Sequence, residues 1–209
     1  MYEYRQLNPK QQAELVEHRL SLGYPAHAPP HPVKDRQLYF LSAACYEHQC
    51  YMHSESRRQQ LLNMIFDRFG DGGDDKESAE ALTTNITICA WAVLPNHYHL
   101  LVQVVNFDVL SELFRQVHGV TSRQWNLEDN TIRRKIWYSW SDRAIRSERH
   151  YYTTLNYIHY NPVKHGLVTS PYDWVESSVH WYLQIYGKQW LRDCWVKYPV
   201  RDYGKDWDV

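Results

Sequence analysis

The chain is organised around the stretch PNHYHLLV, which occupies residues 95–102. A largely apolar run from Ile86 to Leu94 precedes it, and apolar residues continue after it to Val105. A Pro-Asn pair favours a tight turn, so we expect the two flanking runs to pair as a β-hairpin. The pattern therefore predicts strands at 83–94 and 97–105.

His97 and His99 are expected to point to one face of the second strand, because successive side chains of a strand alternate. They would lie about 7 Å apart along the strand. The opposite face is apolar and consists of Tyr98, Leu100, Val102 and Val104. Two imidazoles held in this way form a candidate metal site. The alternative is a pair of incidental strand histidines in a chain that contains twelve.

A second stretch, YIHYNPVKHGLV at residues 157–168, follows a run that predicts a helix from Ser147 to Asn161. Ser147 can cap the helix N-terminus, and Glu148 in the first turn favours the helix dipole. Pro162 is expected to end the helix, because proline lacks the backbone N–H that the next turn needs.

Tyr157 and Asn161 are four residues apart and therefore lie on the same face of this helix. Together they offer a hydroxyl nucleophile and an amide oxygen that could be a third metal ligand. The alternative is that Tyr157 only packs in the core. Three further tyrosines in the same helix could be mistaken for the nucleophile, namely Tyr151, Tyr152 and Tyr160.

Four segments of the chain together resemble the single-tyrosine HUH transposases. These are DNA strand-transfer enzymes with a His-hydrophobic-His strand and a helix that carries one catalytic tyrosine. The segments are LPNHYHLLV, DRAIRSE, YIHYNPVKHGLV and WVESSVHWYL, and their order and spacing match over residues 37–183. The resemblance is in particular to the domesticated members associated with repetitive extragenic palindromes (REP).

The order of the expected elements agrees with this resemblance. Strands at 37–46, 83–94, 97–105 and 136–145 alternate with helices at 53–69 and 108–125. This order predicts an α+β, ferredoxin-like split βαβ fold with an antiparallel sheet. The resemblance further implies that the His pair lies on a central strand and that the tyrosine helix crosses the sheet.

The resemblance also implies a reaction. Tyr157 would attack a phosphodiester of single-stranded or hairpin DNA and form a 5′-phosphotyrosine, and His97, His99 and Asn161 would hold Mg²⁺ or Mn²⁺. Such transposases often have glutamine at the third ligand position, whereas REP-associated relatives commonly have asparagine. No general base for Tyr157 is evident from the sequence.

Charge and aromatic content bear on the partner. The net charge is −1 and the pI about 6.9, which is not typical of a DNA-binding protein. Residues 113–149, however, hold eight basic and four acidic side chains, or +4 locally. Most of the seventeen Tyr and nine Trp are expected in the core, and some could stack on unpaired bases. The candidate DNA-binding residues are Arg115, Arg123, Arg133, Arg134, Lys135 and Arg146.

The remaining features set broad limits. The four cysteines have no CxxC spacing, so reduced thiols are expected rather than a zinc ribbon or disulfides. No signal peptide or membrane span is evident, which favours a cytoplasmic, nucleoid-associated bacterial protein. We expect an N-terminal helix at 9–20 and a Pro-rich arm within 1–35, a catalytic domain at 36–168, and an aromatic-rich extension at 169–209 that packs on it or lines a DNA groove.

Three functions therefore remain open at this point. The first is a metal-dependent tyrosine transposase and single-strand endonuclease. The second is a domesticated protein that binds hairpin DNA without cleaving it, and the third is a metal-dependent nuclease that uses water. A monomer and a dimer are both compatible with the sequence.

Overall fold

The computed structural model describes residues 8–11, 13–14, 17, 37–69 and 86–205. Within the expected N-terminal helix, residues 9–11, 13–14 and 17 are helical. The Pro-rich arm at 21–35 lies outside the described residues. No helix among those described is long and apolar enough to cross a membrane. All four cysteines are free, as expected.

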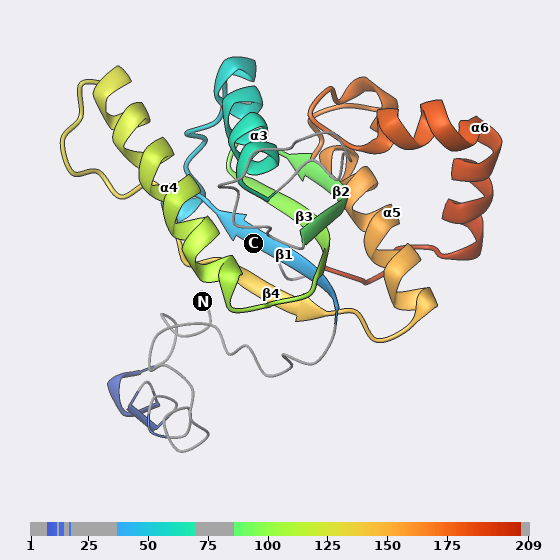
Figure 1. Cartoon of the computed structure of the whole chain (residues 1–209), viewed down its shortest axis with the longest axis horizontal. Coiled ribbons are helices and arrows are strands. Elements are labelled where there is room, and N and C mark those ends of the chain that lie inside the picture. Colours follow the sequence, from blue (N-terminus) through green and yellow to red (C-terminus); the bar gives the residue numbers. More distant parts are fainter. Residues whose placement is uncertain (1–7, 12, 15–16, 18–36, 70–85, 206–209) are drawn as a thin grey trace, which may run out of the picture.

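Four antiparallel strands form one sheet, in the spatial order β2-β3-β1-β4 (Figure 1). The strands are β1 (Leu38–Ala44), β2 (Ile86–Val93), β3 (His97–Val104) and β4 (Ser141–Ala144). Helix α3 (Glu55–Phe69) follows β1, and helix α4 (Val109–Glu128) follows β3. This is the split βαβ arrangement that the sequence predicts, and β3 with its two histidines lies at the centre.

The two faces of β3 differ as strand alternation predicts. Its apolar face packs in a core with α3 and α4, and Tyr98 and Leu100 there are fully buried. The histidine face turns toward the layer of α5 (Glu148–Lys164) and α6 (Val179–Lys197). Figure 1 shows α3 and α4 on one side of the sheet and α5 and α6 on the other.

The fourth strand is shorter than the sequence predicts. Regular pairing with β1 covers only Ser141–Ala144, and the preceding residues contribute one isolated bridge between Cys45 and Trp137. The reason is that β1 ends at Ala44 and the chain turns into a short 3-10 helix, so the partner strand is lost. Trp140 instead stacks on Phe114 of α4, with ring centres 4.6 Å apart.

Helix α5 begins as predicted, because the Ser147 side chain accepts a hydrogen bond from the His150 N–H. The prediction that Pro162 ends this helix is wrong, since α5 continues to Lys164. Gly166, with φ of 67°, ends it instead. The Gly166 N–H donates to the Val163 carbonyl and the Leu167 N–H to the Pro162 carbonyl, at 2.9 and 3.0 Å. This is a Schellman end, which satisfies the last carbonyls of a helix.

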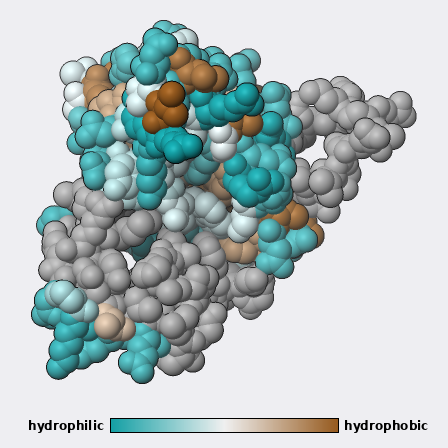
Figure 2. Space-filling view, turned by 90° about the vertical axis from the view of Figure 1, so that its left-hand side faces the viewer, coloured by the Kyte–Doolittle hydropathy of each residue, from teal (hydrophilic) through white to brown (hydrophobic). Residues whose placement is uncertain are grey.

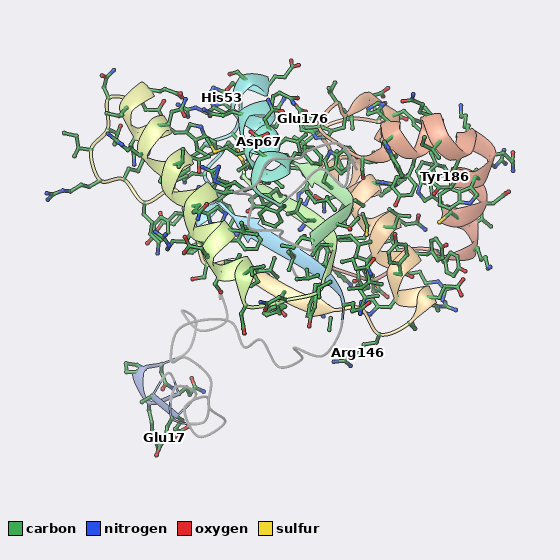
Figure 3. All side chains as sticks on the ribbon, viewed as in Figure 1. Glu17, His53, Asp67, Arg146, Glu176 and Tyr186 are labelled. Atoms are coloured by element: carbon green, nitrogen blue, oxygen red, sulfur yellow. The ribbon has the colours of Figure 1, made fainter. Side chains whose placement is uncertain are left out.

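The C-terminal region contains a helix that the sequence analysis did not predict. Helix α6 is interrupted at Gly187, where φ is 81°, so its apolar pattern does not keep one helical phase. The segment before α6 pairs with the edge of β2, where Ser177 bridges to Ala92. Glu176, labelled in Figure 3, is buried there in an ion pair with Arg58 of α3 at 3.1 Å.

Candidate metal and tyrosine site

Packing brings the predicted metal ligands together from two distant segments. His97 on β3 and Asn161 on α5 are in contact, with 3.0 Å between His97 Nε2 and Asn161 Oδ1. The rings of His97 and His99 have centres 4.9 Å apart. All three side chains are buried. The residues that pair with the histidines on neighbouring strands are small, namely Ala44, Ser42 and Ala92, which leaves room for the imidazoles.

The orientation of His97 suits a metal ligand. Its Nδ1 lies 2.7 Å from Asn96 Oδ1, so the ring can donate its one N–H there. Nε2 then presents a lone pair toward the Asn161 oxygen. Two facing acceptors need a cation or proton between them. A hydrogen bond from the other ring nitrogen is also what commonly fixes a metal-bound histidine.

The spacing of the donors fits a small divalent ion. Two donors bound to one ion at right angles, each at about 2.1 Å, are roughly 3 Å apart. The Nε2–Oδ1 distance of 3.0 Å has this value. Among the described residues, no group of three or more His, Cys, Asp or Glu could hold a metal. A metal bound by the two histidines would need a ligand of another type, and the Asn161 amide oxygen is in contact with His97.

Tyr157 lies beside this cluster. Its ring centre is 5.4 Å from that of His99 and 5.8 Å from that of Phe40. The side chain is only 1% exposed. The cover comes from the chain after α6, where Tyr203 contacts the Tyr157 ring at 5.6 Å and Gly204 lies directly against it.

Three further residues, which were not singled out from the sequence, border the cluster. Lys164 places its Nζ 3.5 Å from the Tyr157 hydroxyl. His165 has its ring centre 4.9 Å from that of His97. Arg143 pairs with Phe40 across the β1–β4 ladder, which puts it on the same sheet face as the histidines. Burial lowers the pKa of Arg143, and the nearby Tyr203 and Tyr157 act in the opposite direction.

A signal for Lys164 and His165 is present in the sequence. Lys164 is seven residues after Tyr157, and His165 is four residues after Asn161. Both therefore share the helix face of the site, provided that the helix continues past Pro162. No helical spacing indicates Arg143, because its position beside the site depends on how β4 pairs with β1.

The candidate DNA-binding residues are spread over the molecule. Arg115 and Arg123 lie on α4, across the sheet from the histidines, and Arg115 is paired with Glu112 at 2.6 Å. Figure 2 faces this side, where the surface is mostly hydrophilic with scattered apolar patches. Arg146 lies between β4 and α5 and points outward (Figure 3). Arg146 precedes Asn161 by 15 residues, which separates the two by roughly 20 Å when counted along a helix.

The loop after α4 holds the other three. Arg133 is exposed, and Arg134 is paired with Asp129 at 2.6 Å. Lys135 lies over the rings of Tyr46 and Tyr138, at 4.6 and 5.6 Å. Two hydrogen bonds connect this loop to the start of the histidine strand. The Tyr46 N–H donates to the Ile136 carbonyl, and the adjacent Cys45 N–H donates to the Asn96 carbonyl.

The predicted site residues lie within a part of the chain that matches a known family. Residues 74–161 match the family described as "Transposase IS200 like". This match contains both histidines, Tyr157 and Asn161. This part of the chain is similar to IS200-like transposases. The resemblance that the sequence predicts is thereby confirmed.

Two proteins of similar sequence carry the name REP-associated tyrosine transposase. The protein from Haemophilus influenzae is 34% identical over 121 residues, which cover 50% of this chain and 65% of the relative. The Escherichia coli protein is 33% identical over 94 residues, which cover 44% and 54%. The chain thus spans less than two thirds of the length of either relative.

A solved structure of similar fold is described as a REP-associated tyrosine transposase bound to a REP hairpin. Its TM-score is 0.54 at 21% identity, over 76% of this chain and 86% of that one. At this identity the likeness supports the fold alone.

Proposed function

We propose that this chain cleaves and rejoins single strands of palindromic repeat DNA, folded as hairpins, with Tyr157 as the nucleophile. The observation that carries the proposal is the contact of His97 with Asn161, one helical turn from Tyr157. The names of the relatives support REP sequences as the substrate class, and the solved structure of similar fold is described as bound to a REP hairpin. Because that substrate is chromosomal, we expect the protein to act at the bacterial nucleoid.

His97, His99 and Asn161 are the residues that would hold the metal ion, and Mg²⁺ or Mn²⁺ there would act as a Lewis acid on a phosphate oxygen. None of these ligands is negatively charged, so they leave the ionic charge available to the phosphate. Asn96 keeps the His97 ring in the orientation that this role requires.

Tyr157 supplies the covalent step. Its oxygen forms a bond to phosphorus while the bond from phosphorus to the 3′ oxygen breaks. The phenol gives up its proton and the departing 3′ oxygen takes one up, which leaves a 5′-phosphotyrosine and a 3′-hydroxyl. Attack by another 3′-hydroxyl reverses these changes and joins the strands. No oxidation or reduction is involved.

Access to Tyr157 requires a movement. The hydroxyl is covered by Tyr203 and Gly204, so a phosphate can approach only when the turn at 200–205 is displaced. The proposed DNA contacts are those of the basic residues predicted from the sequence. Among them we give most weight to Lys135, whose ammonium and the adjacent Tyr46 ring lie at the Asn96 end of the histidine strand.

A covalent-adduct assay tests this function. The protein is incubated with labelled REP-type hairpin oligonucleotides and Mn²⁺, and protein–DNA bands that resist SDS are separated on a gel. We expect a band for the wild type that is lost with chelator and in Tyr157→Phe. Tyr160→Phe is the matched control, because Tyr160 lies on the same helix but is 45% exposed.

Two other outcomes would replace the proposal. The burial of Tyr157 favours, as a second candidate, a hairpin-binding protein without catalysis. That function predicts tight binding and no adduct on any hairpin. Cleavage that persists in Tyr157→Phe would instead indicate a nuclease that activates water.

A further inference from the structure

Lys164, the last residue of α5, bridges the tyrosine nucleophile and the turn that covers it. Its ammonium donates to the Gly204 carbonyl at 2.7 Å and lies 3.5 Å from the Tyr157 hydroxyl. It also lies 5.0 Å from the centre of the Tyr157 ring. Neither the family match, which ends at residue 161, nor the predicted ligand set includes this lysine.

The position of Lys164 follows from the length of α5. Seven residues make nearly two full helical turns, so Lys164 lies on the same face as Tyr157. This holds only because the helix continues through Pro162 and ends at Gly166. A helix that ended at Asn161 would not direct the lysine toward the tyrosine hydroxyl.

The Gly204 carbonyl oxygen is the acceptor that the Lys164 ammonium has while the turn covers Tyr157. It accepts a short hydrogen bond from an ammonium that lies beside the nucleophile oxygen. A phosphate oxygen is also an acceptor, and its negative charge makes the bond to an ammonium stronger. A strand that displaces the turn at 200–205 would therefore offer Lys164 a better partner than the one it loses.

We propose that Lys164 is a catalytic residue that binds the phosphate attacked by Tyr157, in place of the Gly204 carbonyl. Its fixed charge would stabilise the negative charge that builds up on the phosphate during the attack. The inference rests on the proposed function, since it needs DNA to enter at Tyr157. It adds a cation from the chain itself, three residues after the predicted metal ligand Asn161 on the same helix.

The test compares Lys164→Met with Lys188→Met. Lys188 is a matched control, because its ammonium also lies over a tyrosine ring, that of Tyr172 at 5.7 Å, but on α6. The first readout is the rate of adduct formation with a labelled REP-type hairpin and Mn²⁺. For Lys164→Met we expect a fall of about 100-fold, the usual loss when one charge-stabilising donor is removed. Lys164→Arg should recover part of that rate, because it keeps the positive charge.

The second readout does not need chemistry. Binding of the same hairpin, with single-stranded flanks, is measured in the Tyr157→Phe background over a series of salt concentrations. Adding Lys164→Met should reduce the slope of log affinity against log salt by about 0.7, the contribution of one single-strand phosphate. Affinity itself should fall by no more than about tenfold. Lys188→Met should leave both quantities unchanged.

The two readouts separate the possible failures. A reduced salt slope without any adduct in the wild type would support the phosphate contact and refute the proposed chemistry. An unchanged slope together with a wild-type adduct rate in Lys164→Met would overturn the role of Lys164 and leave the proposed function intact. A protein that binds no REP-type hairpin at all would overturn both.

Discussion

Gly204 lies against the ring of Tyr157 so closely that a Cβ at position 204 would stand 2.7 Å from Tyr157 Cζ. The backbone there has φ of 74°, which residues with a side chain rarely adopt. Space and conformation therefore both require glycine. The hydroxyl that we propose as the nucleophile is thus covered by a turn that tolerates no larger residue at its point of contact.

Gly204→Ala should uncover Tyr157. The methyl group clashes with the ring and strains the turn, so the covered state loses about 1–2 kcal/mol relative to the open one. We expect the rate of adduct formation to rise by about tenfold, because this loss of free energy increases the ratio of open to covered protein by that factor. The rate is measured with the hairpin adduct assay.

Gly187→Ala is the control for this prediction. Gly187 also has a positive φ, of 81°, but nothing lies within 4 Å of the Cβ position. This variant shares the backbone strain without the clash. Equal adduct rates in the two variants would show that the turn at Gly204 does not limit access.

Asn96→Ala should weaken the metal site without touching the metal. The substitution removes the acceptor at 2.7 Å that orients His97. Loss of such a partner typically lowers metal affinity about 10- to 100-fold. Mn²⁺ binding is followed by the electron paramagnetic resonance signal of the free ion. Asn106→Ala, in an exposed loop, serves as the control, and an unchanged Mn²⁺ affinity in Asn96→Ala would contradict the assignment of His97 as a ligand.

Stability should fall between pH 7 and pH 5. Burial lowers the pKa of His118 to about 3, and burial with a smaller effect of His180 does the same for His159. Below pH 6.5 the unfolded chain binds protons that the folded protein does not, so stability is lost as pH falls toward 3. Each histidine should cost about 2 kcal/mol between pH 6.5 and pH 5.

Urea unfolding at the two pH values checks this prediction. The variant His118→Gln removes one of the two titrating groups, and Gln retains a polar group near the Tyr98 hydroxyl, which lies 2.8 Å from His118 Nε2. The loss of stability on acidification should then be about half that of the wild type, since one of two equal groups is removed. The same loss in both proteins would count against this explanation.

Lys135→Ala should weaken hairpin binding more than Arg115→Ala. Lys135 is connected to the start of the histidine strand through Ile136, Tyr46 and Cys45, whereas Arg115 is held by Glu112 on the far side of the sheet. For Lys135→Ala we expect the slope of log affinity against log salt to fall by the contribution of about one phosphate contact. For Arg115→Ala we expect the slope to stay unchanged. Fluorescence anisotropy with a labelled hairpin measures both. The reverse order would place the DNA over α4.

The sequence predicted the helix and strand that form the site better than it predicted where they end. The period of two along β3 put His97 and His99 on one face, and the helical period put Tyr157 near Asn161. The end of α5 could not be predicted from Pro162 alone. A proline near the C-terminus costs only one helical hydrogen bond, and the Gly166 end satisfies the remaining carbonyls.

What the sequence by itself determined is therefore local: which side chains share a strand face or a helix face, since these depend only on backbone periods. No spacing in the chain shows that Asn161 meets His97, 64 residues away, which only the resemblance implied, and tertiary structure alone decided that Gly204 covers Tyr157. It also placed Arg143 on the histidine face through pairing with Phe40. Such contacts depend on how helices and strands pack, and packing is set by the shapes of many side chains together rather than by any one spacing.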